Sequence, residues 1–431
     1  MLNAREPGAS GIVAPDVTGA LVVFCVTYLV IASRQLHFLK LDRPAGATVG
    51  AVAMVVVGGL PMDAALHAID LHVLVLLFGV LLIAAYLQEA QFFRLAAYHV
   101  LTRASSARSL MFGIVFVAGA LSAFLVNDTV CIVLTPLVVA VVVEARLPAL
   151  PYLIGLASAA NVGGVVSLAG NPQNMIVGAA AEGRLGFAHY MLLTFPVGLA
   201  CLAANAALLF WLFRFDLPAG PLAERSPPRP AVDRVLAIKG LGALVLFAAL
   251  AFAGVSLAGA SVSAAAALML AARSRVPREA FRHVDWPLLV FFAGLFVVVA
   301  GIAHAGVIED LFQRVAPVID RGDVLGDLAF IAIVVIASNI VSNVPFVLVA
   351  VAWIPHMTDP TWGYVMLAVA STLAGNLTLF GSVANIIVME SAGPRGEIGF
   401  WKFLRYGSLI TVVDLVLAFG ILGGERLAGI H

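Results

Sequence analysis

The sequence predicts an all-α polytopic membrane protein, and its composition and its long apolar segments support that prediction. Of the 431 residues, 62% are hydrophobic and only 11% are charged, whereas a soluble domain is roughly 45–50% apolar and about 25% charged. Segments that approach the ~20 apolar residues needed to cross a bilayer recur along the whole chain. The mean hydropathy of +1.07 and the net charge of zero exclude a soluble enzyme, a disordered chain and a nucleic-acid-binding protein.

The apolar segments are continuous, which predicts helices, because the strands of a membrane barrel alternate apolar and polar residues. Two further segments, 90–103 and 306–317, are amphipathic and are expected to lie at the membrane interface. The apolar segments fall at 18–33, 43–60, 72–88, 109–126, 130–146, 150–170, 188–213, 236–255, 258–272, 287–304, 325–340, 344–354, 363–380 and 404–424.

The distribution of basic residues predicts how the chain is oriented. Cytoplasmic loops of membrane proteins are enriched in Lys and Arg. An outside N-terminus places 19 of the 24 basic residues in inside segments. We therefore expect a bacterial-type plasma (inner) membrane protein with both termini outside. The polar, Pro-rich segment 216–235 is then a cytoplasmic linker between two halves, 1–215 and 236–431.

The two halves are related by an internal repeat. SAFLVNDT (122–129) corresponds to SNIVSNVP (338–345), and SLAGNPQNMIV (167–177) corresponds to TLFGSVANIIV (378–388). This alignment pairs Asn127 with Asn343 and Asn174 with Asn385. The basic loop follows the first span in one half (34–43) and the second span in the other (273–282), so the repeats are expected to be inverted. Inverted repeats place a site at their interface near the membrane midplane and are common in secondary transporters.

Four polar segments interrupt the apolar runs, and non-helical backbone at membrane depth is tolerated only where it lines protein or a water cavity. At Asn127-Asp128-Thr129 either two helices cross the membrane or the chain returns as a re-entrant hairpin, and we favour the hairpin because its tip would lie at the midplane. The glycines and Pro172 in 161–174, and Gly375 and Gly381 in 375–385, are expected to break helices. Single polar residues in membrane helices usually hold helices together, but these clusters recur at matched positions. The expected substrate- or ion-binding residues are Asn127, Asp128, Thr129, Asn161, Gly170, Asn171, Asn174, Ser338, Asn339, Ser342, Asn343, Asn376, Thr378, Ser382 and Asn385.

Two carboxylates at membrane depth are candidates for coupling to a proton or a cation, because ionisable groups there usually serve function. Asp128 follows Asn127 at the first expected hairpin tip, where its alternative role is a cap on a half-helix. Asp414 lies in the middle of the last span, where its alternative role is to accept a hydrogen bond inside the bundle. No ATP-binding, HExxH or GxSxG motif occurs, so we expect neither an enzyme nor a metal site, and no cofactor beyond H⁺ or Na⁺ as coupling ion.

Four motifs resemble the ion transporter superfamily, which includes ArsB-type arsenite permeases, NhaD-type antiporters, citrate transporters and divalent-anion/sodium symporters. The motifs are LVNDTVCIVLTPLVV (125–139), SAANVGGVVSLAGNPQNMIVG (158–178), SNIVSNVPFVLVA (338–350) and AGNLTLFGSVANIIV (374–388). The resemblance implies a homodimer, with a scaffold part and a transport part in each half and an elevator movement of the transport parts. It also implies about ten transmembrane helices besides two re-entrant hairpins, at 109–146 and 325–354, and one helix broken at the midplane in each half.

The first tip most resembles the arsenite-permease and antiporter branch, whereas the symporters carry Ser-Asn-Thr at both tips. No Arg lies in the four polar segments, although a multivalent anion would favour one. We therefore expect proton-coupled efflux of arsenite, antimonite or another small inorganic oxyacid, with a soluble ATPase partner left open. The alternatives are a sodium-coupled carboxylate or anion symporter, a Na⁺/H⁺ antiporter that uses Asp128, and a channel or membrane enzyme.

Overall fold

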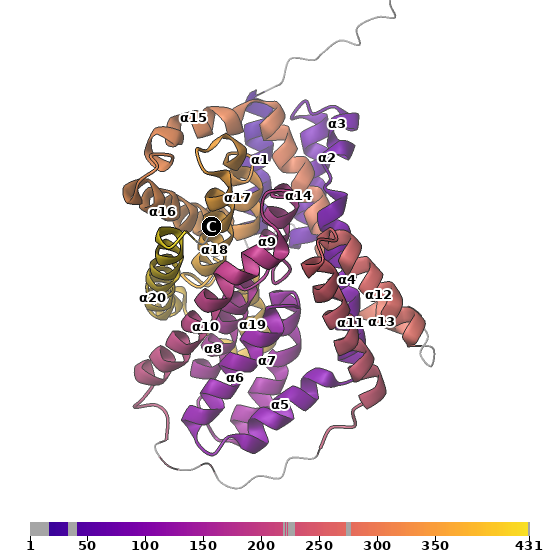
Figure 1. Cartoon of the computed structure of the whole chain (residues 1–431), viewed down its shortest axis with the longest axis vertical. Coiled ribbons are helices and arrows are strands. Elements are labelled where there is room, and N and C mark those ends of the chain that lie inside the picture. Colours follow the sequence, from indigo (N-terminus) through magenta and orange to yellow (C-terminus); the bar gives the residue numbers. More distant parts are fainter. Residues whose placement is uncertain are drawn as a thin grey trace, which may run out of the picture. The chain divides into compact units, whose positions relative to one another are not determined.

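The computed structural model describes residues 17–32, 41–218, 220, 222, 229–272 and 277–429. All regular secondary structure in these residues is helical (Figure 1). The prediction of an all-α membrane protein is therefore confirmed. Six of the basic residues used to predict the orientation lie outside the described residues, as does most of the stretch 219–228 of the expected linker. Those six are Arg5, Arg34, Lys40, Arg225, Arg273 and Arg275.

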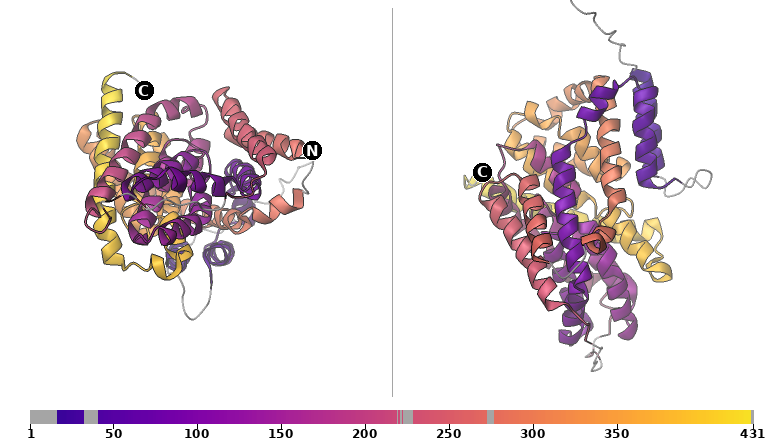
Figure 2. Two further views of the ribbon diagram at one scale, coloured as in Figure 1. Left: turned by 90° about the horizontal axis from the view of Figure 1, so that it is seen from below. Right: turned by 90° about the vertical axis from the view of Figure 1, so that its right-hand side faces the viewer.

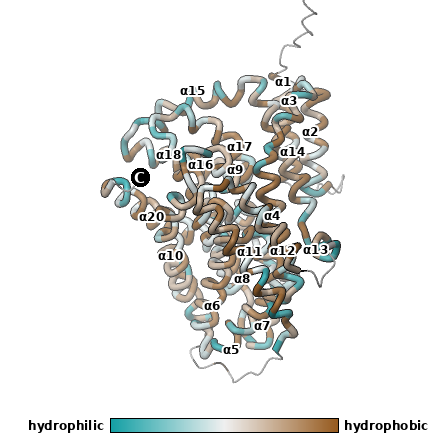
Figure 3. The backbone as a smooth tube through the Cα atoms, turned by 45° about the vertical axis from the view of Figure 1, so that its right-hand side comes forward, coloured by the Kyte–Doolittle hydropathy of each residue, from teal (hydrophilic) through white to brown (hydrophobic). Residues whose placement is uncertain are grey.

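Seven of the described helices are long and apolar enough to cross a membrane. Figure 3 shows hydrophobic residues running through most of the helices, with hydrophilic residues concentrated in α13 (Pro277–His283) and near helix ends. The seven are α4 (Leu71–Glu89), α7 (Asn127–Glu144), α10 (Phe187–Leu212), α11 (Arg234–Phe252), α14 (Trp286–His304), α16 (Val324–Val341) and α20 (Phe400–Leu427). Because α7 and α16 are among them, the expected re-entrant hairpins stay a prediction.

The chain forms two compact units, and the first comprises residues 1–70 and 290–314. Its described helices are α1 (Val17–Ala32), α2 (Arg43–Val56), α3 (Met62–His67), most of α14 and the beginning of α15 (Val307–Ile319). Asp42 caps the N-terminus of α2 by accepting a hydrogen bond from the Ala45 amide at 2.9 Å. Within this unit Gly294 of α14 lies directly against the backbone of Ala47 in α2, where a Cβ would approach to 2.8 Å. Small residues let membrane helices pack this closely.

The second unit comprises residues 71–289 and 315–431. Within it, α4, α11 and α12 (Leu257–Ala271) lie side by side (Figure 2). The Ser261 hydroxyl of α12 donates to the Val75 carbonyl of α4 at 3.4 Å. Besides α7, α10, α13, α16 and α20, this unit contains α5 (Phe92–Arg103), α6 (Ala107–Ser122), α8 (Ala149–Val165), α9 (Pro172–Ala180), α17 (Asn343–Ala350), η1 (Ile354–His356), α18 (Pro360–Ala374), α19 (Val383–Ser391) and η2 (Gly393–Gly396). The compact units do not follow the linker that separates the expected repeats, so the division at 216–235 stays a prediction.

The helices end close to the expected breaks, with shifts that follow from capping chemistry. Asn127-Asp128-Thr129 forms the first turn of α7 rather than the turn before it, which spans 123–126. Likewise, α8 continues past Asn161 to Val165, and the break covers only 166–171. Short polar side chains favour helix ends because they can bond to free backbone groups there.

Candidate functional site

Two asparagines stabilise the break between helices α8 and α9. Asn171 caps α9 by accepting a hydrogen bond from the Asn174 amide at 2.8 Å. The Asn174 side chain in turn donates to the carbonyls of Gly164 (2.9 Å) and Ser167 (3.1 Å). A break at membrane depth leaves carbonyls without helical partners, and each such group needs another donor. Asn174 supplies that donor twice.

The second broken pair, α18 and α19, repeats this arrangement. Ser382 caps α19 and accepts a hydrogen bond from the Ala384 amide at 3.2 Å. The Asn385 side chain donates to the carbonyls of Gly375 (2.7 Å) and Thr378 (2.9 Å). These carbonyls lie ten and seven residues before Asn385, the same separations as for Asn174. The two breaks therefore have the same local structure, as the sequence alignment of Asn174 with Asn385 predicts.

Each break is also bonded to the broken helix of the other half. Asn171 and Asn174 both bond the Thr372 hydroxyl of α18 at 3.1 Å, the first as donor and the second as acceptor. In return, Ser382 donates to Asn161 of α8 at 3.0 Å. Asn161 then donates to the Asn385 oxygen at 3.2 Å. Asn161 and Thr372 thus have corresponding roles, and the two halves are joined by a reciprocal set of buried hydrogen bonds.

Asn161 is the centre of this network and is fully buried, with 0% of its surface exposed. Its side-chain oxygen accepts hydrogen bonds from Asn127 of α7 and from Ser382, each at 3.0 Å. Its nitrogen donates to the Asn376 oxygen at 2.9 Å as well as to Asn385. Residue 127 begins α7 and residue 382 caps α19. Asn161 therefore lies where two helix N-termini meet, a position of partial positive charge.

The network extends to a buried carboxylate. The Asn376 side chain donates to Asp414 Oδ2 of α20 at 3.4 Å, and Asn205 of α10 donates to the same oxygen at 3.2 Å. Asp414 is fully buried. A continuous series of buried polar side chains therefore runs from Asn127 through Asn161 and Asn376 to Asp414.

Both expected hairpins are attached to the break of their own half. The Asn127 amide donates to the Gly170 carbonyl at 3.1 Å, and Ser167 donates to the Ala123 carbonyl in the turn before α7. In the other half, Thr378 donates to Asn339 of α16 at 2.8 Å. Ser167 and Thr378 are aligned residues, so a hydroxyl in each break bonds to the expected hairpin of its own half.

The turn between α16 and α17 contains one strained residue. Ser342 has φ 74° and ψ 153°, a backbone region that is essentially restricted to glycine. The next residue, Asn343, accepts a hydrogen bond from the Val344 amide at 2.9 Å. Such strain persists only where surrounding contacts hold it, and it is often found at ligand sites and moving segments.

Three buried oxygens near the two tips have no hydrogen-bond partner among the described residues. They are Asn127 Oδ1, Ser122 Oγ and Ser338 Oγ. Buried polar atoms are satisfied in most proteins, so unpartnered ones need an explanation. Bound solute or water would satisfy them. Asp128 and Thr129 lie beside Asn127 in the first turn of α7, Asp128 buried and Thr129 half-buried.

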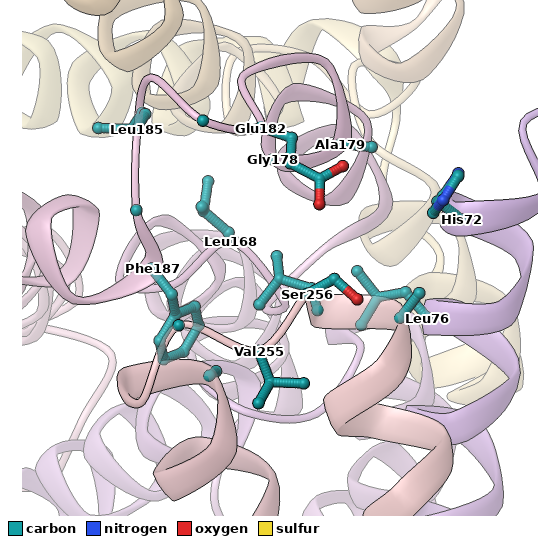
Figure 4. A pocket seen from close by; sticks show the side chains of 16 residues that line it. His72, Leu76, Leu168, Gly178, Ala179, Glu182, Leu185, Phe187, Val255 and Ser256 are labelled. Atoms are coloured by element: carbon teal, nitrogen blue, oxygen red, sulfur yellow. The ribbon is translucent and has the colours of Figure 1, made fainter.

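A cavity of about 140 Å³ lies in the second unit beyond the C-terminal end of α9. Gly178 of α9, Glu182 and Ser256 line it, together with Leu76 of α4 (Figure 4). None of the expected site residues is among its lining residues. Leu168, which lies in the break between α8 and α9, also lines this cavity, so the cavity reaches the edge of the first break (Figure 4).

The structure thus brings together Asn127, Asn161, Asn376, Ser382, Asn385 and Asp414, and it joins Asn171 and Asn174 to them across the halves. Sequence reasoning missed Thr372, Asn205 and Gln173, whose side chain donates to Thr372 at 3.3 Å. The repeat contained a signal for Thr372, because the alignment that pairs Asn174 with Asn385 also pairs Asn161 with Thr372. Asn205 carries no such signal, since it is a lone polar residue in an apolar helix.

Comparison with known proteins places this arrangement among transporters. Residues 26–363 match the sequence profile of the citrate transporter family CitMHS. The silicon efflux transporter LSI3 of Oryza sativa subsp. japonica is 29% identical, over 95% of this chain and 98% of its own. An uncharacterized transporter of Mycobacterium tuberculosis is 31% identical, over 93% of this chain and 96% of its own. The putative transporter arsB of Dictyostelium discoideum is 24% identical, over 93% and 91%.

Among solved structures, the YdaH transporter of Alcanivorax borkumensis superimposes with a TM-score of 0.59. The match covers 96% of this chain and 98% of that one, at 15% sequence identity. At this identity the likeness concerns the fold alone.

Proposed function

The chain belongs to the citrate transporter family CitMHS, and we propose that it exports a small, weakly charged inorganic oxyacid, with arsenite or antimonite as the leading candidates. The family resemblance predicted from the four motifs is confirmed, and the chain is a multi-pass secondary transporter rather than an enzyme. The substrate, the direction of transport and the coupling ion are our proposals.

The observation that carries this proposal is the chemistry around Asn161. The side chains that meet there are amides and hydroxyls, namely Asn127, Ser382, Asn376 and Asn385. An undissociated oxyacid carries hydroxyl groups that both donate and accept, and amides match both roles. The unpartnered oxygens of Asn127 and Ser338 are further acceptors for such a solute.

The charge distribution disfavours a multivalent carboxylate, although the family is named after citrate transport. No Lys or Arg occurs in the polar segments 122–129, 161–174, 338–345 and 375–385. Multivalent carboxylates are usually bound by Arg or Lys. Partial positive charge comes instead from helix N-termini, which suit the electron-rich oxygens of a neutral oxyacid. Two relatives are named for silicon efflux and as a putative arsB, and silicic and arsenious acid share this polyhydroxyl chemistry.

We further propose that transport proceeds by alternating access, with inward proton movement driving export. The reciprocal bonds that join Asn161 and Thr372 to the opposite breaks favour movement of both broken helix pairs as one body. An elevator movement against a dimeric scaffold fits this arrangement. Asp128 and Asp414 are the buried carboxylates within reach of the network. On this proposal the protein resides in the inner membrane with both termini outside.

The experiment is accumulation of arsenite by everted vesicles that contain the full-length protein. An imposed proton gradient, acidic inside, is expected to drive accumulation, whereas a sodium gradient is not. Asn161→Ala is expected to abolish the flux. Ser158→Ala is the matched control, because the Ser158 hydroxyl bonds only to the Gly155 carbonyl of its own helix at 3.3 Å. Absence of arsenite, antimonite and silicic acid flux under either gradient would disprove oxyacid export, and sodium-driven citrate uptake would replace it.

A further inference from the structure

The packing of α20 on α10 encloses one carboxylate away from both hairpin tips. Asp414 lies midway along α20 and has no exposed surface. Its Oδ2 accepts two hydrogen bonds, from Asn205 of α10 and from Asn376 of the second break. Its other oxygen, Oδ1, has no partner among the described residues.

Two more oxygens near this carboxylate are also buried and unpartnered within the described part of the chain. They are Asn205 Oδ1 and Thr411 Oγ1. Residue 411 precedes residue 414 by three positions on α20, so the two side chains share one face of the helix. Asn205 is the residue that donates to Asp414 through its nitrogen. The interface therefore gathers a carboxylate oxygen, an amide oxygen and a hydroxyl oxygen that no hydrogen bond joins in the described structure.

No positive charge balances Asp414 in the described structure. The helices packed against α20 are α10 and α18. The titratable group that faces Asp414 from them is Cys201 of α10, whose thiol lies 3.6 Å from the Asp414 carbonyl oxygen. No Lys, Arg or His of the described residues forms an ion pair with the carboxylate. An ionised carboxylate without a partner is highly unfavourable in such a place, and taking up a proton removes the charge.

A proton on Asp414 Oδ1 also supplies a hydrogen-bond donor to the unpartnered oxygens beside it. Protonated Asp414 can donate to Asn205 Oδ1 or to Thr411 Oγ1, while Oδ2 keeps its two amide donors. Asp128 differs in its position, because it lies in the first turn of α7 beside Asn127.

We propose that Asp414 is the residue that binds the coupling proton, in a site completed by Asn205 and Thr411. Asn376 links this site to the solute site, because its nitrogen donates to Asp414 and its oxygen accepts from Asn161. Loss or gain of the proton changes the charge on the acceptor of Asn376 and so the strength of that hydrogen bond. This inference rests on the proposed function, in that the proton is assigned the role of driving solute export.

The first test is Asp414→Asn in everted vesicles loaded by a proton gradient. The amide keeps an oxygen for Asn205 and Asn376 but cannot release a proton. The variant is expected to lose at least tenfold in proton-driven arsenite accumulation while it retains arsenite exchange between equal concentrations on both sides. Thr411→Val is expected to weaken accumulation, and Thr411→Ser to restore it. Val416→Ala is the control, because Val416 lies on the same helix with 68% of its surface exposed.

Two outcomes of this test overturn the proposal. Accumulation at the wild-type level in Asp414→Asn means that the proton binds elsewhere. Loss of both accumulation and exchange in a protein that still folds means that Asp414 holds the solute site together and does not carry the proton.

The second test needs no solute and therefore separates this inference from the proposed function. Infrared difference spectra of the reconstituted wild-type protein, recorded between acidic and alkaline pH, are expected to contain a protonated-carboxyl band that Asp414→Asn lacks. If arsenite is not transported but this band is present, the proposed substrate fails and the proton site stands. If the spectra of wild type and variant coincide, or if sodium at constant pH displaces the proton, the proton site fails.

Discussion

Asn174 and Asn385, which lie in different halves of the chain, make the same pair of hydrogen bonds. Each side-chain nitrogen donates to the carbonyls seven and ten residues earlier, across a break in its own helix. Each side-chain oxygen accepts from the broken helix of the other half, Asn174 from Thr372 and Asn385 from Asn161. One residue type thus both stabilises a break and joins it to its counterpart, which ties the shape of each break to that of the other.

Replacing Asn161 by Ala should destabilise the protein and abolish transport. The substitution removes the partner of Asn127, Ser382, Asn376 and Asn385 at once. A buried polar group left unsatisfied typically costs about 1–3 kcal/mol. Thermal unfolding in detergent should show a clear decrease in midpoint, together with loss of arsenite flux. A variant with normal flux would mean that the network only packs the helices, and Ser158→Ala controls for a small cavity in α8.

Replacing Gly170 by Ala should disrupt the close backbone packing at the break between α8 and α9. A Cβ at this position would lie 2.6 Å from the Gly164 carbonyl oxygen and 2.8 Å from the Ser122 carbonyl oxygen, and backbone atoms cannot yield as side chains can. We expect destabilisation of at least ~1–3 kcal/mol, as for overpacked cores, measured as reduced yield and a lower unfolding midpoint. Gly186→Ala is the control, since a Cβ added there would have no neighbouring atom within 4 Å. Equal stability of the two variants would contradict the close approach.

Replacing Ser342 by Gly should stabilise the turn between α16 and α17. The serine is held at φ 74° and ψ 153°, and strain of this kind costs on the order of 1–3 kcal/mol. Glycine relieves it but gains freedom in the unfolded chain, so the net gain should be about 1 kcal/mol. Ser342→Ala keeps the strain and should show no such gain. A lower unfolding midpoint for Ser342→Gly than for Ser342→Ala would contradict the strain, since both variants lack the hydroxyl.

Replacing Arg426 by Gln should loosen the end of α20. The guanidinium pairs with Asp359 at 3.0 Å and Asp327 at 3.5 Å, and it lies 4.7 Å from the centre of the Trp362 ring. These groups are partly exposed, so solvent screening limits the effect to about 0.5–1 kcal/mol. Unfolding measured at low and high salt should show a smaller difference from wild type at high salt. Arg321→Gln, which breaks a more exposed pair with Asp323, should have less effect; an equal effect would contradict the network.

Much of the fold could be predicted from local sequence, because the bilayer leaves few alternatives. Continuous apolar runs must become helices whose backbone groups are satisfied internally. A proline alone does not end a helix here, since Pro136 and Pro196 lie inside α7 and α10. The breaks near Asn174 and Asn385 could be predicted because glycines and short polar residues cluster there in both halves. The exact helix ends did not, since α7 begins at Asn127 itself.

The contacts of the candidate site required the folded chain. Composition and periodicity are sufficient for helices, breaks and the repeat, because these depend on neighbours along the chain and on the surrounding lipid. Which amides meet depends on how helices pack. Thr372 reaches Asn171 across 201 residues, and Asn205 reaches Asp414 across 209. Hydrogen bonds act only at about 3 Å, so a difference of one helical turn in packing would place these side chains against lipid instead of against each other.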